Sequence, residues 1–214
     1  MGAEKQIVRI GGIHELDRIA KDHKEYHKLI MLLLTSFIRE KSPLLGESNS
    51  KLQKISLDVQ TALTTLARRN SINDKEERLD LSFTFLRGAD FRGTERREAF
   101  FNKASFKGSN LSEAYFSEAH LTEANFSGAN LQGADLSKAS LRKANFSGAN
   151  LRETGFFEAK HLEETNFNEA DTTRANFKGA NLSQVFNLNQ AQINNAFRNE
   201  STQLPVYLEV TSRL

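Results

Sequence analysis

The chain has 214 residues, a formal net charge of +2 and no cysteine. These figures exclude disulfides, thiolate metal sites and cysteine catalysis, whereas a hydrophobic share of 38% still permits a buried core. The longest apolar run, residues 29–34, is far shorter than the ~20 residues that a membrane-spanning helix needs, and residues 1–12 show no secretory signal. We therefore expect a cytoplasmic protein with no membrane partner.

Residues 1–78 are expected to form an α-helical N-terminal cap region. Four apolar residues recur at helical spacing in its first part: Ile13, Leu16, Ile19 and Ala20. The apolar run that follows continues this pattern as a buried helix. A further helix is predicted after Ser56, its N-cap, with Asp58 in the first turn. The buried stripe of that helix is expected to be Val59, Ala62, Leu63 and Leu66.

Residues 79–186 show a period of five, with Leu or Phe at every fifth position and usually Ala two positions before it. Residues 114–153 read AYFSE AHLTE ANFSG ANLQG ADLSK ASLRK ANFSG ANLRE. A period of five fits neither a helix nor a flat strand, so only a coil with a repeating turn aligns these side chains. With four units in each coil, the large central residue and the preceding Ala point inward. The other three positions face water.

Folding the units at twenty residues per coil predicts four columns of central residues. Two columns are rich in phenylalanine: Leu86, Phe106, Phe126, Phe146, Phe167 and, opposite, Phe116, Leu136, Phe156, Phe177. The other two are mainly leucine: Leu81, Phe101, Leu121, Leu141, Leu162, Leu182 and Phe91, Leu111, Leu131, Leu151, Thr172. We expect the phenylalanine rings to stack along the coil axis.

This pattern resembles the pentapeptide-repeat family, whose consensus A(D/N)LXX is matched over residues 79–186. The resemblance implies a right-handed quadrilateral β-helix, a pentapeptide-repeat solenoid, of about five coils. The helical flank is similar to the region before the repeats in a bacterial, often cyanobacterial, group of this family. Because a coil exposes backbone and apolar surface at its ends, both flanks are expected to act as caps.

Two breaks in the repeat are the candidate binding positions. In GTERREAF the expected central residue is Arg96, which a dry core does not accept unpaired, so Arg96 and Arg97 form either an exposed contact spot or a covered bulge. In FFEAKHLEET the register shifts by one residue, so Lys160 or His161 must bulge outward. Both are protein-binding candidates, with a purely structural bulge as the alternative.

Residues 187–214 are expected to form a C-terminal capping helix and tail. The segment NQAQINNAF predicts a short helix that buries Ala191, Ile193, Ala196 and Phe197. The ending of the chain is also similar to a common C-terminal ending in the family. With this cap in place, both ends of the coil stack are expected to be closed.

No set of residues in the sequence converges as a catalytic, metal or cofactor site, and we expect a protein that is not an enzyme. His23 and His27 are spaced like helix metal ligands, but HKEYH lacks the glutamate of HEXXH and a third ligand.

We expect a monomeric structural or interaction protein that binds an unidentified protein. The alternative, implied by relatives that modulate DNA gyrase by mimicking DNA, requires a strongly acidic surface. Residues 79–186 carry 13 basic and 14 acidic side chains, which weighs against both mimicry and nucleic-acid binding.

Overall fold

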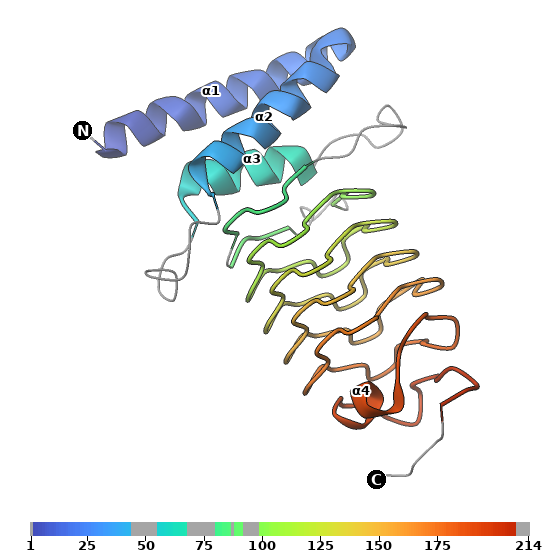
Figure 1. The fold of residues 1–214 in the computed structure, drawn as a ribbon. Coiled ribbons are helices and arrows are strands. Elements are labelled where there is room, and N and C mark those ends of the chain that lie inside the picture. The colour runs from blue at the N-terminus through green and yellow to red at the C-terminus, as the bar shows by residue number, and fades with distance from the viewer. Residues whose placement is uncertain (1, 44–54, 68–79, 87, 92–98, 209–214) are drawn as a thin grey trace.

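The computed structural model describes residues 2–43, 55–67, 80–86, 88–91 and 99–208. Within these residues, a helical unit lies at one end of a stack of coils and a short helix lies at the other (Figure 1). The elements in chain order are α1 (Gly2–Asp22), the 3₁₀ helix η1 (Lys24–Tyr26), α2 (His27–Lys41), α3 (Leu57–Ala67) and α4 (Gln190–Asn194). α3 lies between the coils and the other two long helices (Figure 1).

The coils stack through isolated parallel β-bridges between residues twenty positions apart. One coil is joined to the next by Ser105↔Asn125, Asn110↔Asn130, Tyr115↔Asp135 and His120↔Ser140. Each residue of these four bridges precedes a buried central residue, so a coil has four faces and the stack has four columns of core side chains. The described part of the coils therefore contains bridges but no longer strands.

The four faces are named here by their central residues. Face 1 contains Leu81, Phe106, Phe126, Phe146 and Phe167; face 2 contains Leu86, Leu111, Leu131, Leu151 and Thr172. Face 3 contains Phe91, Phe116, Leu136, Phe156 and Phe177; face 4 contains Phe101, Leu121, Leu141, Leu162 and Leu182. A rung is one such residue with its two outward neighbours and the residue at the following corner.

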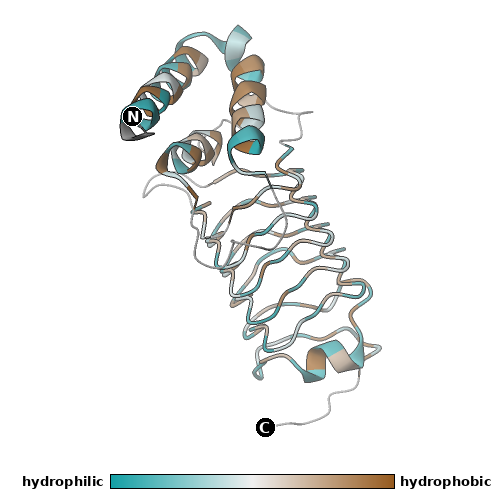
Figure 2. Ribbon diagram, turned by 60° about the vertical axis from the view of Figure 1, so that its left-hand side comes forward, coloured by the Kyte–Doolittle hydropathy of each residue, from teal (hydrophilic) through white to brown (hydrophobic). Residues whose placement is uncertain are grey.

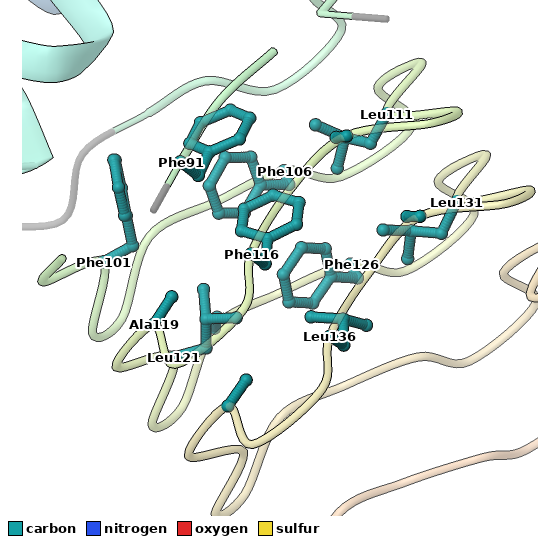
Figure 3. Packing of buried hydrophobic residues seen from close by; sticks show 14 of the residues in the cluster. Phe91, Phe101, Phe106, Leu111, Phe116, Ala119, Leu121, Phe126, Leu131 and Leu136 are labelled. Atoms are coloured by element: carbon teal, nitrogen blue, oxygen red, sulfur yellow. The ribbon is translucent and has the colours of Figure 1, made fainter. Parts of the chain in front are cut away.

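The predicted phenylalanine ladders are confirmed. On face 1, the ring centroids of Phe126 lie 5.0 Å from those of Phe106 and Phe146, with interplanar angles of 7° in both pairs. Across the core, Phe116 meets Phe126 edge to face, with centroids 5.8 Å apart (Figure 3). Stacked contacts therefore run along each column and edge contacts join the two columns, which are both favourable geometries for aromatic pairs.

The predicted columns are wrong for the first coil. Its bridges span 25 residues, as in Asp80↔Ser105 and Asp90↔Tyr115, whereas the bridges that begin at Phe100 to Ser140 span 20. Leu81 therefore begins face 1, and the ring of Phe91 stacks on Phe116 at 4.3 Å. The sequence register assumed that every five-residue unit forms one face, but five more residues separate the first coil from the second.

The helical unit packs largely as its sequence pattern predicts. Ile13 and Ala20 of α1 are buried and Leu16 and Ile19 are partly buried against the core. The buried stripe predicted for α3 is confirmed, since Val59, Ala62, Leu63 and Leu66 are all 0% exposed. α2 is hydrophobic around much of its circumference, whereas hydrophobic and hydrophilic residues alternate along the coils (Figure 2).

The C-terminal segment buries only part of the predicted set. Ile193 is buried and Ala196 is partly buried against the core, but Ala191 is exposed and Phe197 is 50% exposed. Phe197 forms a bridge with Asn176, so it occupies an outward position of face 3 and its side chain leaves the core. Gln192 is buried instead. The helical pattern failed here because α4 ends at Asn194 and the chain then resumes the path of a coil.

Candidate interaction surface

The outward side chains of the coils are held by hydrogen bonds to their own turns. The Oδ1 atoms of Asn125 and Asn145 each accept a hydrogen bond of 3.0 Å from the backbone N–H two residues later. Between coils, Asn150 Nδ2 donates to Asn130 Oδ1 at 3.0 Å. A corner residue such as Glu118 then adopts a positive φ of 63°. The surface is therefore pre-organised, which lowers the entropic cost of binding.

The helical unit closes the edge of the first coil at three of its faces. The side-chain amide of Gln60 donates to Asp90 O at 2.8 Å and its Oε1 accepts from Asp90 N at 3.0 Å, as a neighbouring coil would. On faces 2 and 4, backbone carbonyls of the helical unit accept hydrogen bonds from the first coil. Ser42 O accepts from Phe85 N at 2.7 Å, and Ala67 O accepts from Phe100 N at 3.2 Å. These backbone groups are thus unavailable for pairing with another strand.

Gln192 performs the corresponding role at the C-terminal end. Its Nε2 atom donates to Phe167 O and to Ala170 O, both at 2.8 Å, and its backbone carbonyl accepts from Thr172 Oγ1 at 2.8 Å. The side chain of Asn189 forms a capping box with Gln192 at the start of α4. The polar Thr172 in a leucine column is therefore explained by its contact with the cap.

A buried carboxylate fastens α1 to α3. Asp58 is 1% exposed and accepts hydrogen bonds from Arg9 Nε and Gln6 Nε2. Burial by itself raises the pKa of Asp58, but a hydrogen bond from Ser56 and those from α1 outweigh it. The pKa is lowered to about 2. The carboxylate is therefore ionised at neutral pH and acts as a structural anchor.

Only the second of the two candidate binding positions lies within the described residues. Arg96 and Arg97 lie outside the described residues. Lys160 keeps its bridge to Ser140, and His161, with φ 51°, is the extra residue, because the next bridge spans 21 positions. Lys160 and His161 are both exposed on face 4.

Aromatic residues at outward positions of the repeats were not among the residues predicted to bind a partner. Phe100 stacks on His120 on face 4, with centroids 4.6 Å apart and planes at 21°. On face 3, Tyr115 is 45% and Phe157 is 39% exposed. The predicted columns place these positions on their faces, but they do not show that the Phe100 and His120 rings stack.

Within the described ranges, no group of three or more His, Cys, Asp or Glu side chains could hold a metal ion, and no helix is long and apolar enough to span a bilayer.

A hydrogen bond from Thr173 lowers the pKa of Asp171. Burial opposes a decrease in the pKa of Asp80, but hydrogen bonds from Ser82 lower it. These carboxylates are stabilised as anions, which is the opposite of what a general acid needs.

Comparison with known proteins agrees with the repeat geometry. The model of the family of pentapeptide repeats matches eight copies, which together cover residues 78–156 and 161–197, more than half of the chain. The chain therefore belongs to the pentapeptide repeat family. No curated protein matches it in sequence.

Several solved pentapeptide repeat structures are similar to this chain. Rfr23 from the cyanobacterium Cyanothece 51142 is 25% identical, with 62% of this chain and 68% of that chain covered and a TM-score of 0.28. A protein of the Arabidopsis thaliana thylakoid lumen is 30% identical, with 46% and 61% covered and a TM-score of 0.23. QnrB1, a plasmid-mediated fluoroquinolone resistance protein, is 20% identical, with 60% and 78% covered and a TM-score of 0.26.

Proposed function

We propose that the protein is a non-enzymatic interaction protein whose repeat surface binds another protein. The observation that carries this proposal is the division of each coil into a filled core and a fixed exterior. Central residues such as Phe126 and Leu131 are 0% exposed, so only outward side chains are available for contact. A rigid convex surface of this kind suits a protein partner better than a small substrate.

The finer architecture proposed is the right-handed quadrilateral β-helix that the family resemblance implies, divided into residues 1–78, 79–186 and 187–214. The four bridge columns support the quadrilateral cross-section. The same proposal includes a cytoplasmic location and no nucleic-acid partner. Both are supported by sequence features alone, including the balanced charge of the repeats.

The proposed contact residues are Arg96 and Arg97 at the first break and Lys160 and His161 at the second. Lys160 and His161 are supported by exposure and by the local departure from the coil path at His161. Acidic and basic groups lie beside them, since Glu164 is 3.6 Å from Lys143 and 3.8 Å from Arg142. A partner that approaches this part of face 4 therefore meets charges of both signs.

The test is affinity capture from the native cell with matched charge-reversal variants. Arg96→Glu/Arg97→Glu and Lys160→Glu/His161→Glu are compared with Lys107→Glu, which changes an exposed lysine on face 1. We expect a specific protein to be retained by the wild type and by the control and to be lost from one of the double variants. Retention by every variant would contradict the proposed contact residues, and failure to retain any protein would contradict the proposed function.

The alternative of topoisomerase modulation by DNA mimicry is disfavoured by the 13 basic and 14 acidic side chains of the repeats. A DNA gyrase supercoiling assay addresses it directly. We expect no response to stoichiometric amounts of the protein, and a response would favour the alternative.

A further inference from the structure

Face 3 has two middle rungs whose outward residues differ in size and charge. On the rung of Leu136 they are Asp135, Ser137 and, at the corner, Lys138; on the rung of Phe156 they are Gly155, Phe157 and Glu158. The two rungs are adjacent, because Asp135 forms a bridge with Gly155. The same three positions therefore carry contrasting side chains one coil apart.

The corner charges of these rungs have no internal ion-pair partner. Neither Lys138 nor Glu158, both exposed, forms an ion pair with any described residue. On face 4 the equivalent charges do pair, since Lys143 Nζ lies 3.6 Å from Glu164 Oε2. Face 3 thus presents two opposite charges that an external surface can satisfy.

The shape of the two rungs is also complementary. Phe157 projects as an aromatic ring that is 39% exposed, whereas the matching residue on the rung above is the small Ser137. Gly155 carries no side chain at the position that Asp135 occupies on the adjacent rung. A Cβ built at Gly155 would lie at ordinary contact distances from Asp135 Oδ1 and Ser137 Oγ, both 3.5 Å, and from Ala134 O, 3.8 Å.

We propose that face 3 binds face 3 of a second copy of this chain, with the two coil stacks antiparallel. A two-fold axis between the middle rungs places Lys138 opposite the second copy's Glu158 and Phe157 opposite its Ser137. Asp135 then faces Gly155, which has no side chain. Each contact occurs twice, as in every isologous interface. A two-fold axis parallel to the stacks instead opposes each rung to the same rung of the second copy, so Lys138 and Glu158 would not meet.

The neighbouring rungs fit the same axis. The rungs of Phe116 and Phe177 are equidistant from it, so Glu118 lies directly opposite Gly179 of the second copy. Lys178 of the second copy is the residue beside Gly179, which brings its charge close to Glu118. Four rungs at the usual strand spacing of about 4.8 Å make a contact only about 20 Å tall. Such a face is smaller than a standard interface of about 800 Å² per partner, so the dimer should be reversible and concentration-dependent. This departs from the monomer expected from the sequence and goes beyond the proposed binding of another protein.

Sedimentation equilibrium of the full chain over a series of protein concentrations tests the proposal. We expect a monomer–dimer equilibrium for the wild type. Lys138→Glu and Glu158→Lys should each weaken dimerisation at least about tenfold, because each opposes like charges twice. The double variant Lys138→Glu/Glu158→Lys should regain the wild-type constant to within about threefold, because the reversed charges face each other again. An equimolar mixture of the two single variants should form a heterodimer.

The matched control is Lys143→Glu/Glu164→Lys together with its two single variants on face 4, none of which should change dimerisation. Thermal unfolding verifies that all variants are folded. A protein that stays monomeric at the highest concentration reached would overturn the proposal. So would a dimer that tolerates both single reversals on face 3, since association would then use another surface.

Discussion

The repeat stack and the helical unit are held together by different kinds of contact. In the stack, each coil repeats the contacts of its neighbour, so that Phe126 meets Phe106 and Phe146 at the same distance and angle. In the helical unit, each contact occurs once. The Gln60 side chain and the Ser42 carbonyl each form hydrogen bonds with the backbone of one coil residue, Asp90 and Phe85, respectively. Asp58 accepts a hydrogen bond from Arg9. The stack thus spreads its stability over many equivalent contacts, whereas the cap depends on a few individual residues.

This difference matters most where the two regions meet. The first coil has a neighbour on one side only, and its other side is covered by single residues of the helical unit. A substitution inside the stack removes one of many similar contacts but leaves a cavity, whereas a substitution in the cap removes a contact that no other residue reproduces. Four sets of variants test this difference, in order of decreasing expected loss of stability.

The largest effect is expected inside the stack. Phe126→Ala removes a fully buried ring that contacts rings above, below and across the core, and it should lower the free energy of unfolding by about 3 to 5 kcal/mol. Denaturant titration at low protein concentration measures the loss. Phe157→Ala, an exposed phenylalanine of face 3, is the control and should cost less than about 1 kcal/mol. Equal losses in the two variants would contradict the ladder.

At the junction, Gln60→Ala should lower the free energy of unfolding by about 1 to 3 kcal/mol, because it removes both side-chain hydrogen bonds to the backbone of Asp90. Faster hydrogen exchange at the Asp90 amide should accompany the loss. Gln132→Ala changes an exposed glutamine on face 2 and should leave both measurements unchanged. An unaltered exchange rate at Asp90 in Gln60→Ala would show that the cap does not depend on this side chain.

The anchor between α1 and α3 should make stability depend on pH in the acid range. The folded-state pKa of Asp58 is lowered to about 2 from 3.8, so its contribution is complete above pH 4 and is lost as the pH falls through 2. The contribution amounts to about 2 kcal/mol, from 1.36 kcal/mol per pKa unit. Unfolding measured from pH 6 to pH 2 should show this loss in the wild type.

Asp58→Asn should lack this part of the pH dependence and should be less stable than the wild type at pH 6. Asp22→Asn, at a half-exposed aspartate of α1, serves as the control and should follow the wild-type curve. If Asp58→Asn also follows the wild-type curve, the anchor does not contribute to folding stability.

The smallest effect concerns two glycines at equivalent corners of face 1. Gly108 and Gly128 both have φ +64°, so alanine at either position should cost about 1 kcal/mol for the left-handed conformation. At Gly108, a Cβ would also lie 2.8 Å from Cε1 of Phe83, whereas it would meet nothing within 4 Å at Gly128. Gly108→Ala should therefore cost slightly more, because the exposed Phe83 ring must move.

Adding Phe83→Ala to each glycine variant isolates that contact. In the Phe83→Ala background, Gly108→Ala and Gly128→Ala should have the same effect on the free energy of unfolding. A difference that persists without the Phe83 ring would show that the backbone at the two corners, and not this contact, distinguishes Gly108 from Gly128.

The sequence by itself determined the coil and its core. A period of five with alanine before each large residue permits only one arrangement in which Phe126 and Leu131 are buried and Asn125 and Asn130 face solvent. The inward and outward positions could therefore be predicted from the sequence. One extra residue at Lys160 or His161 was also predictable, because the spacing of core residues changes there by one, but only the structure identifies it as His161. Helical spacing likewise identified the buried stripe of α3.

Only the tertiary structure decided how the ends and the faces are arranged. The register of the first coil depends on the pairing of Asp90 with Tyr115, and the closure of its edge depends on Gln60, a residue with no signal in its own sequence context. The predicted columns already place Lys138 and Glu158 on one face, but only the structure shows that neither forms an ion pair with a described residue. Local spacing specifies which side chains point inward, but contacts between residues distant in the chain specify which outward side chains become neighbours.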